Sequence, residues 1–276
     1  MDNIDKLIER GDALLAQEQY ESAIVLYNKV IKTEGATSEL LERRGLCYYG
    51  FGDSDRAFSD LNQAVEIAPE NDNALFNRGL IYMYENRPAE ALRDIEAAIK
   101  ICGFDLEYLL HCALLNIDLK RYEKAVLVCQ EILKPEPENI TALEYQAAAY
   151  NALEQFTASE EIFRQLIDLN TADPVFHDGL GLALSKMDRD EEALGHFDHA
   201  LKIEPQFPEP WNNRGFSKFK LGQVGEGLQD IEHSIYLDSS NGYAYRNRGL
   251  IYASQGKRDL AAEDFKTAKE LGYDVA

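Results

Sequence analysis

Cysteine is scarce in this 276-residue sequence, and long apolar runs are missing from it. The four cysteines, Cys47, Cys102, Cys112 and Cys129, form no C-x-x-C pair and have no metal-ligand spacing. We therefore expect free thiols in a reducing compartment and a cytoplasmic protein. No stretch approaches the length of about 18 apolar residues that a spanning helix needs, so we expect no membrane insertion. The first residues, Met1–Lys6, lack the basic run and apolar core of a secretory signal.

Positive charge is also in short supply. The sequence has 28 lysine and arginine residues against 49 aspartate and glutamate residues, which gives a formal charge of −21 and a pI near 4.6. Binding to nucleic acid or to an anionic membrane surface needs a clustered basic surface, so both are disfavoured. A basic protein or peptide is the partner that this charge favours. The hydrophobic content of 45% is typical of a folded protein.

Sequence motifs of catalysis are missing as well. The chain has no H-E-x-x-H sequence, no nucleophile elbow and no glycine loop that follows a strand to cradle phosphate. His196 and His199 lie three residues apart without an evident third metal ligand, and we interpret them as part of a solvated helix face. We interpret His177 as a core residue. The sequence therefore predicts no catalytic residue, no metal, no cofactor and no enzyme.

What the sequence does contain is an internal period of 34 residues. Small residues recur at this spacing, without insertion, in two series that lie twelve residues apart. The first series is Gly11, Gly45, Gly79, Ala113, Ala147, Gly181, Gly215 and Gly249. The second series is Ala23, Ala57, Ala91, Ala125, Ser159, Ala193, Gly227 and Ala261. The period predicts eight repeats, at residues 4–37, 38–71, 72–105, 106–139, 140–173, 174–207, 208–241 and 242–275.

Each repeat has the pattern of two amphipathic helices. In the third repeat, Leu75, Gly79 and Tyr82 recur at helical spacing, and Ala91 and Ile95 do so after a turn. Small residues in the two series let the helices approach closely, and larger side chains fill the space that remains. The sequence therefore predicts an all-α fold.

The seventh repeat departs from this pattern in its second helix. Gly225 and Gly227 both lie in that helix. A glycine in a helix interior costs roughly 1 kcal/mol relative to alanine. We therefore expect this repeat to be locally soft.

The repeats resemble the tetratricopeptide repeat (TPR) family, whose helix-turn-helix unit of the same length has matching small, aromatic and proline positions. The resemblance extends over residues 4–275. It implies a right-handed α-solenoid, with one continuous core and a single TPR superhelix through residues 1–276. It also implies that the first helices of the repeats line a concave groove.

Two positions in the repeats vary together. The residue before the first series is arginine in five repeats, and an aspartate follows sixteen residues later in four of them. The pairs are Arg44–Asp60, Arg78–Asp94, Arg214–Asp230 and Arg248–Asp264. No repeat without the arginine has the aspartate. We predict a bridge between the two helices of each of these repeats, which fixes helix register and contributes about 0–1 kcal/mol where it is partly exposed.

The resemblance points to a peptide-binding groove. In TPR proteins that hold extended peptides, an asparagine two residues before the first series often bonds the ligand backbone, and Asn77, Asn213 and Asn247 occupy that position. In other repeats the position holds Arg43, His111 and Tyr145. Apolar side chains just after the first series are expected to face the same groove, unless superhelical packing buries part of them. They are Leu46, Leu80, Leu114, Leu182, Phe216 and Leu250, with Tyr49, Met83 and Phe219 one turn further on.

Some TPR domains bind the C-terminal carboxylates of heat-shock chaperones through lysine, asparagine and arginine at set positions. The matching positions here hold Ile8, Asp12, Arg43, Asn73 and Asn77. The first lysine and asparagine are missing, and the aspartate would repel a carboxylate. We do not expect a clamp of that kind at this end of the chain.

These patterns predict a non-catalytic scaffold or adaptor that binds a protein or peptide, basic or amphipathic in character, in the concave groove. One alternative is a self-assembling TPR scaffold, a homo-oligomer in which the groove or the array ends bind a second copy. A second alternative is a dedicated chaperone or inhibitor that masks one basic partner.

Overall fold

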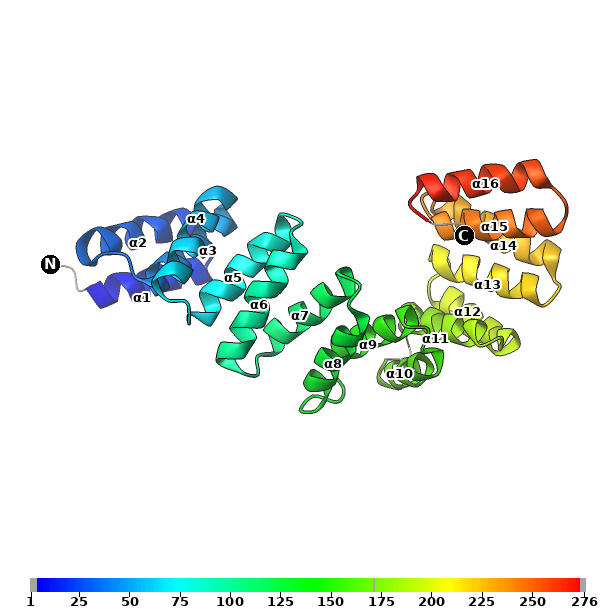
Figure 1. Cartoon of the computed structure of the whole chain (residues 1–276), viewed down its shortest axis with the longest axis horizontal. Coiled ribbons are helices and arrows are strands. Elements are labelled where there is room, and N and C mark those ends of the chain that lie inside the picture. The colour runs from blue at the N-terminus through cyan, green and yellow to red at the C-terminus, as the bar shows by residue number, and fades with distance from the viewer. Residues whose placement is uncertain (1–3, 171, 274–276) are drawn as a thin grey trace. The chain divides into compact units, whose positions relative to one another are not determined.

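The computed structural model describes residues 4–170 and 172–273, and within them the chain forms sixteen α-helices and no strand (Figure 1). The chain divides into two compact units, Met1–Pro135 and Glu136–Ala276, which we call the N-terminal half and the C-terminal half. The helices of the N-terminal half are α1 (Ile4–Ala16), α2 (Tyr20–Glu34), α3 (Ser38–Phe51), α4 (Ser54–Ile67), α5 (Asp72–Tyr84), α6 (Pro88–Cys102), α7 (Leu106–Asp118) and α8 (Tyr122–Leu133). Those of the C-terminal half are α9 (Ile140–Ala152), α10 (Phe156–Leu169), α11 (Pro174–Lys186), α12 (Asp190–Ile203), α13 (Pro208–Lys220), α14 (Val224–Leu237), α15 (Gly242–Ser254) and α16 (Arg258–Glu270).

The all-α fold and its helix pairs are confirmed. Each expected repeat contains two helices, and the first of each pair begins at the first residue of its repeat. Residues 1–3, where a secretory signal was sought, lie outside the described residues. So do residue 171 of the fifth repeat and residues 274–275 of the eighth. The single superhelix through both halves stays a prediction. The four cysteines are free, as expected, and no described helix has the length and apolar character to cross a bilayer.

Capping side chains determine where the first helices begin. The side chain of Asn71 accepts a hydrogen bond from the backbone N–H of Ala74 at 3.0 Å. Caps of this kind satisfy an N–H group that has no partner inside the helix. Equivalent caps recur at the same place in the repeat, at Thr37, Asp105, Asn139, Asp173 and Asn241. The 34-residue period therefore includes the starting point of the helices.

The two helices of a repeat meet where a small residue faces a large one. A Cβ atom added at Gly79 would lie 2.8 Å from Cγ1 of Ile95, sixteen residues later. An equivalent atom at Gly181 would lie 2.6 Å from the Phe197 ring. Contacts this short exclude any larger residue, because protein interiors are close-packed. The first series of small residues is therefore required by the approach of the helices.

The turn between the two helices has the same backbone geometry in every repeat. One residue there has a positive φ angle, between 57° and 88°, which is the left-handed region. The eight residues are Glu18, Gly52, Asn86, Lys120, Glu154, Asp188, Gly222 and Gly256. Glycine adopts this conformation at no steric cost, whereas the other residue types are strained in it. Helix packing therefore imposes the turn even where the local sequence disfavours it.

The four predicted arginine–aspartate bridges are confirmed. Arg78 on α5 donates from Nε and Nη2 to the two carboxylate oxygens of Asp94 on α6, at 2.6 and 2.8 Å. The same two-point contact occurs in Arg44–Asp60, Arg214–Asp230 and Arg248–Asp264. The arginine side chains are 14–21% exposed and the aspartate side chains 5–13% exposed. These pairs are more buried than the sequence led us to expect, so losing one partner is costly.

Three of these arginines also bind the preceding repeat. Nη1 of Arg78 donates to Oδ1 of Asn62 on α4 at 3.0 Å. Arg44 reaches Asn28 and Arg214 reaches Asp198 in the same way, at 2.6 and 2.7 Å. Each of these acceptors lies sixteen residues before its arginine. One guanidinium therefore joins three helices and holds two repeats in register.

The glycines of the seventh repeat have a packing role. A Cβ atom at Gly227 would lie 2.5 Å from the carbonyl oxygen of Gly215, and one at Gly215 would lie 2.6 Å from the carbonyl oxygen of Gly227. Backbone therefore meets backbone between α13 and α14. The side chain missing from α14 at Gly227 is what permits this approach. Gly225 has no neighbour near its Cβ position, so it remains the position at which we expect softness.

The buried bridge predicts strong coupling between Arg78 and Asp94. We expect Arg78→Leu and Asp94→Val each to lower the free energy of unfolding by about 3 kcal/mol, because each leaves one charge without its partner. The double variant is expected to recover most of this loss, since it reproduces the apolar residue types of Leu180 and Val128 at the same positions in other repeats. Urea unfolding of the four proteins measures the coupling. If the loss of unfolding free energy in the double variant equals the sum of the losses in the two single variants, Arg78 and Asp94 are not coupled and the predicted pair is wrong.

Candidate functional site

Successive first helices contact one another in parts of both halves. Helix α3 contacts both α1 and α5 in the N-terminal half, and α13 contacts both α11 and α15 in the C-terminal half. Among the described residues, no two successive second helices approach each other as closely. We call the surface formed by first-helix residues near the first small-residue series the inner face of each half. The predicted site residues all lie on first helices.

The N-terminal inner face begins with a polar network. Asn77 on α5 donates from Nδ2 to Oε1 of Glu42 on α3 at 2.8 Å. Burial raises the pKa of Glu42 to about 7, although Arg43 and the hydrogen bond from Asn77 act to lower it. Nε of Arg43 lies 3.2 Å from Oδ1 of Asp12 on α1, and the same oxygen accepts a hydrogen bond from the Tyr27 hydroxyl at 2.7 Å. The predicted residues Asn77 and Arg43 thus belong to one network that links three first helices.

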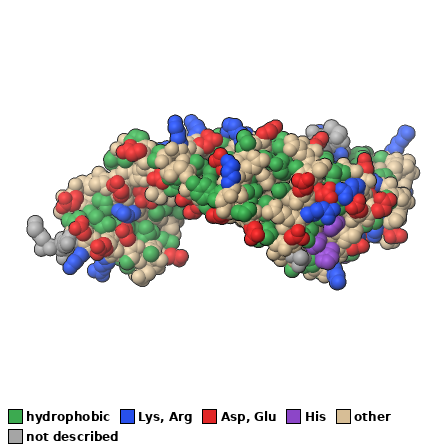
Figure 2. All heavy atoms as spheres, turned by 90° about the horizontal axis from the view of Figure 1, so that it is seen from below, with side chains coloured by type: hydrophobic (Ala, Val, Ile, Leu, Met, Phe, Trp, Pro, Cys, Tyr) green, Lys and Arg blue, Asp and Glu red, His purple; other side chains and the backbone are tan. Residues whose placement is uncertain are grey.

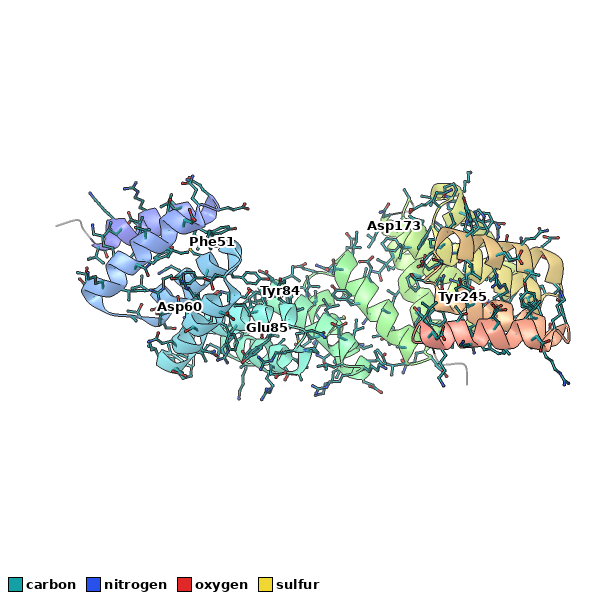
Figure 3. All side chains as sticks on the ribbon, turned by 90° about the horizontal axis from the view of Figure 1, so that it is seen from above. Phe51, Asp60, Tyr84, Glu85, Asp173 and Tyr245 are labelled. Atoms are coloured by element: carbon teal, nitrogen blue, oxygen red, sulfur yellow. The ribbon has the colours of Figure 1, made fainter. Side chains whose placement is uncertain are left out.

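Aromatic rings extend this inner face beyond the polar network. The rings of Tyr49 on α3 and Tyr84 on α5 meet edge to face, with centroids 6.1 Å apart. Tyr49 is 37% exposed, Tyr84 is 72% exposed, and the neighbouring Phe51 is 53% exposed. Figure 3 labels Phe51 and Tyr84 at the ends of α3 and α5. The predicted apolar residues Leu46, Leu80, Leu114 and Met83 are half-buried, so they both pack against neighbours and reach the surface.

His111 lines a shallow hollow at the start of α7. The hollow has a volume of about 390 Å³, and its other lining residues include Leu106 and Leu110. Nδ1 of His111 lies 2.9 Å from the carbonyl oxygen of Glu107, and its ring meets the Phe76 ring edge to face. The hollow is open and partly apolar, which suits a side chain of a bound peptide.

The C-terminal inner face repeats the asparagine–carboxylate arrangement. Asn213 on α13 donates from Nδ2 to both carboxylate oxygens of Asp178 on α11, at 3.0 and 3.2 Å. Burial raises the pKa of Asp178 to about 7, and the hydrogen bond from Asn213 lowers it in part. Asn247 on α15 is 8% exposed and donates to Oδ1 of Asn212 at 3.0 Å. Asn247 is therefore nearly enclosed, whereas Asn213 is half-buried.

Sequence reasoning missed the acceptors of these asparagines. Each acceptor lies 35 residues before its asparagine: Glu42, Asp178 and Asn212. The sequence feature that could have revealed these acceptors is an acidic or amide residue three positions before the small first-series residue of the preceding repeat. The asparagine and its acceptor stand at different positions of successive repeats. Residues that recur at one position therefore do not reveal the hydrogen bond between them.

The remaining predicted residues complete the C-terminal inner face. The rings of Phe216 and Phe219 on α13 have centroids 5.9 Å apart. Leu182 on α11, Leu250 on α15 and Tyr145 on α9 are half-buried. This half therefore combines hydrogen-bonding amides with aromatic and aliphatic surface, as the N-terminal half does.

Three histidines meet on the sixth repeat, which the sequence did not reveal. His177 on α11 lies with its ring centroid 4.2 Å from that of His199 and 5.9 Å from that of His196, both on α12. Figure 2 shows histidine side chains, in purple, on the surface of the C-terminal half. His177 is 6% exposed, in agreement with its interpretation as a core residue. Within residues 4–170 and 172–273, no three His, Cys, Asp or Glu side chains are arranged to hold a metal ion.

The repeat sequence is similar to that of known repeat proteins. A family model described as tetratricopeptide repeat matches residues 8–72, and a second of the same description matches residues 72–104. The mitochondrial import receptor subunit TOM70 of Homo sapiens is 26% identical over 273 residues, which cover 93% of this chain and 44% of that protein. The Hsp70-Hsp90 organizing protein 1 of Glycine max is 26% identical over 262 residues, covering 94% of this chain and 40% of that protein.

A solved structure has the same fold. A tetratricopeptide repeat protein from Parabacteroides merdae superposes with a TM-score of 0.60 at 19% identity, over 90% of this chain and 98% of that chain. With the period, the helix pairs and the family matches, this likeness identifies the class: the chain is an α-solenoid of helix-turn-helix repeats. Its sequence matches tetratricopeptide repeat models over residues 8–104, and its fold is that of a tetratricopeptide repeat protein. The chain spans less than half the length of the two curated relatives above.

The histidine group predicts acid sensitivity of the sixth repeat. Burial lowers the pKa of His196, and the neighbouring His177, Arg164 and His199 lower it further, while Glu192 raises it. Because the fold favours the neutral imidazole, its contribution to stability is complete above the unfolded pKa of about 6.5 and is lost as the pH falls below it. We expect His196→Asn to flatten the dependence of unfolding free energy on pH between 7 and 5, by at most about 1.4 kcal/mol per pH unit for one proton.

Urea unfolding at a series of pH values measures this effect. His233→Asn is the matched control, because His233 lies outside the group and contacts Trp211 instead. If the unfolding free energy of His196→Asn depends on pH as strongly as that of wild type, protonation of His196 does not cause the acid sensitivity.

Proposed function

We propose that this chain is a non-catalytic scaffold or adaptor that binds a segment of a partner protein on the inner faces of its first helices. The observation that carries the proposal is the recurrence of one arrangement in both halves: a half-buried asparagine held by a carboxylate, beside aromatic and aliphatic side chains. An amide both donates and accepts hydrogen bonds, so it can bind a peptide backbone whatever the peptide sequence. The surrounding rings and leucines bind apolar side chains.

The relatives support a protein as the ligand. One is named as an import receptor subunit and the other as an organizing protein for Hsp70 and Hsp90. Both names describe proteins that engage other proteins. Because this chain spans less than half of either relative, their particular partners are not transferred to it.

Charge favours a basic or amphipathic partner. The chain has a formal charge of −21, and acidic side chains lie on or beside the inner faces, among them Asp12, Glu42 and Asp178. Unlike charges attract over distances of about 8–10 Å at physiological ionic strength, which accelerates association with a basic surface. The free thiols fit a cytoplasmic protein.

Within the proposed site, residues have different roles. Asn77 and Asn213 contact the ligand backbone, and Arg43, His111 and Tyr145 supply polar contacts in other repeats. Asn247, being 8% exposed, acts mainly through Asn212. Tyr49, Met83, Phe216 and Phe219, with the leucines just after the first series, form the apolar part. The rigid stacking of helices limits the entropy that binding costs.

Capture of a partner by matched variants tests this proposal. We expect the triple variant Asn77→Ala, Asn213→Ala and Asn247→Ala to bind its partner at least about tenfold more weakly than wild type, because several hydrogen bonds of about 1 kcal/mol each are lost. The control is Gln63→Ala, Gln130→Ala and Gln229→Ala, which removes three exposed amides from second helices α4, α8 and α14. Circular dichroism verifies that all three proteins are folded.

The outcomes separate the possible sites. A partner retained by wild type and by the glutamine control but lost by the asparagine variant supports the inner face. Equal retention by both variants would move the binding site to the second helices or the array ends. Capture of a second copy of the chain itself, with a mass that rises with concentration, would favour the self-assembling alternative.

A further inference from the structure

Three amide side chains and one carboxylate form a continuous chain of hydrogen bonds across α11, α13 and α15. Nδ2 of Asn247 donates to Oδ1 of Asn212 at 3.0 Å. Nδ2 of Asn212 donates to Oδ1 of Asn213 at 3.1 Å. Nδ2 of Asn213 donates to Oδ1 and Oδ2 of Asp178 at 3.0 and 3.2 Å. The chain joins the first helices of the sixth, seventh and eighth repeats, all within the C-terminal half.

The carboxylate determines the direction of every bond in this chain. An ionised carboxylate only accepts hydrogen bonds, so Asn213 must present its NH₂ group to Asp178. The oxygen of Asn213 is then turned toward Asn212, which must donate to it. By the same reasoning Asn247 must donate to Asn212. A single charged group thus fixes the rotation of three amides, the last of which lies on a helix two repeats away.

Among its described residues, the N-terminal half contains an asparagine–carboxylate hydrogen bond like the one that begins this chain, without the further amide–amide hydrogen bonds. Asn77 donates to Glu42, in the same register as Asn213 and Asp178. A longer chain needs a second amide next to the asparagine, as in Asn212–Asn213, and here that position is Phe76. The next repeat has His111 where the eighth has Asn247. The two halves therefore offer a built-in comparison between an isolated link and a chain.

We infer that Asp178 is a positioning residue, which orients the amides of Asn213, Asn212 and Asn247 in one direction. Because Asn212 and Asn247 are only 4% and 8% exposed, the direction of the chain acts on a bound peptide by setting which atom of the half-buried Asn213 amide faces it. This inference rests on the proposed function of the inner face. If the direction were reversed, the oxygen and nitrogen of each amide would exchange places. A ligand N–H that meets an oxygen in one arrangement would then meet an NH₂ group in the other.

The same geometry makes the chain sensitive to pH near neutrality. Burial raises the pKa of Asp178 to about 7, and the charge of Glu209 on α13 raises it further, while the hydrogen bond from Asn213 lowers it. Above this pH the carboxylate holds the chain in one direction. Below it the neutral acid can donate as well as accept, so the direction is no longer imposed. We expect affinity for a peptide that fits the ordered arrangement to fall as the pH is lowered from 8 to 6.

Side-chain amide signals in NMR spectra of the ligand-free protein test the chain itself. We expect the NH₂ signals of Asn213, Asn212 and Asn247 to shift together between pH 5.5 and 8.5, with one midpoint near 7. Asp178→Asn should abolish the shared shift, while Asn77, held by Glu42, continues to titrate as an internal control. Asn212→Ala should cut the chain in the middle, so that Asn213 still titrates and Asn247 does not. A shift confined to Asn213 in wild type, or a shared shift that survives in Asp178→Asn, would overturn the inference.

Binding of a synthetic 18-residue amphipathic peptide of lysine and leucine tests the functional consequence. We expect wild type to bind it about fivefold or more weakly at pH 6 than at pH 8, and Asp178→Asn to show a flatter profile. If the amides titrate together but the peptide binds at neither pH, the proposed function is at fault and the positioning role stands. If the peptide binds and the pH profile is the same in Asp178→Asn, the positioning role is wrong and the proposed function stands.

Discussion

The close approach of two helices at a glycine or alanine is the contact on which this structure depends. A small residue on the first helix accepts the large side chain sixteen residues later, as Gly79 accepts Ile95, where an added Cβ atom would lie only 2.8 Å from Cγ1. Because a single helix pair cannot bury its apolar surface alone, repeats must stack. Close contact within the pairs lets each pair present the same surface to the next. The caps and the left-handed turns recur at the same spacing for the same reason.

Polar links across repeats add order to this stack. Each of three arginines joins the two helices of its own repeat and the second helix of the repeat before, as Arg78 does with Asp94 and Asn62. The asparagines of the inner faces link first helices to first helices. Both kinds of link place charged groups in partly buried positions, where their ionisation depends on their partners. Of these linking side chains, Asn77 and Asn213 are also the ones proposed to contact a ligand.

Much of the fold could be predicted from the sequence, because eight repeats constrain one another. The first residue of each predicted repeat is the first residue of a helix, and the co-variation of arginine and aspartate located four ion pairs, as in Arg78–Asp94. Contacts that the repeats share only in part were harder to predict. The second partner of Arg44, Arg78 and Arg214, in the preceding repeat, is Asn28, Asn62 and Asp198 respectively, so one residue type does not reveal it. His177 was recognised as a core residue, but its contact with His196 and His199 depends on helix packing that sequence spacing does not specify.

The binding role of the candidate site residues stays a prediction. The asparagines and apolar side chains lie on first helices, as the repeat pattern indicated, but the carboxylates that hold Asn77 and Asn213 were not foreseen. The left-handed conformation of Lys120 and Glu154 also could not be predicted, since neither residue type favours it. In each case the three-dimensional approach of two helices outweighs the local preference of the residue.

Hydrogen exchange of backbone amides, with and without a captured partner, tests whether the partner binds on the first helices. Because helix amides are exchange-protected in proportion to the stability of the structure around them, ligand contact should slow exchange where it occurs. We expect the bound partner to slow exchange in first helices such as α3, α5, α11 and α13, and to change exchange in the second helices little. Protection confined to the second helices, or to the two ends of the chain, would contradict it.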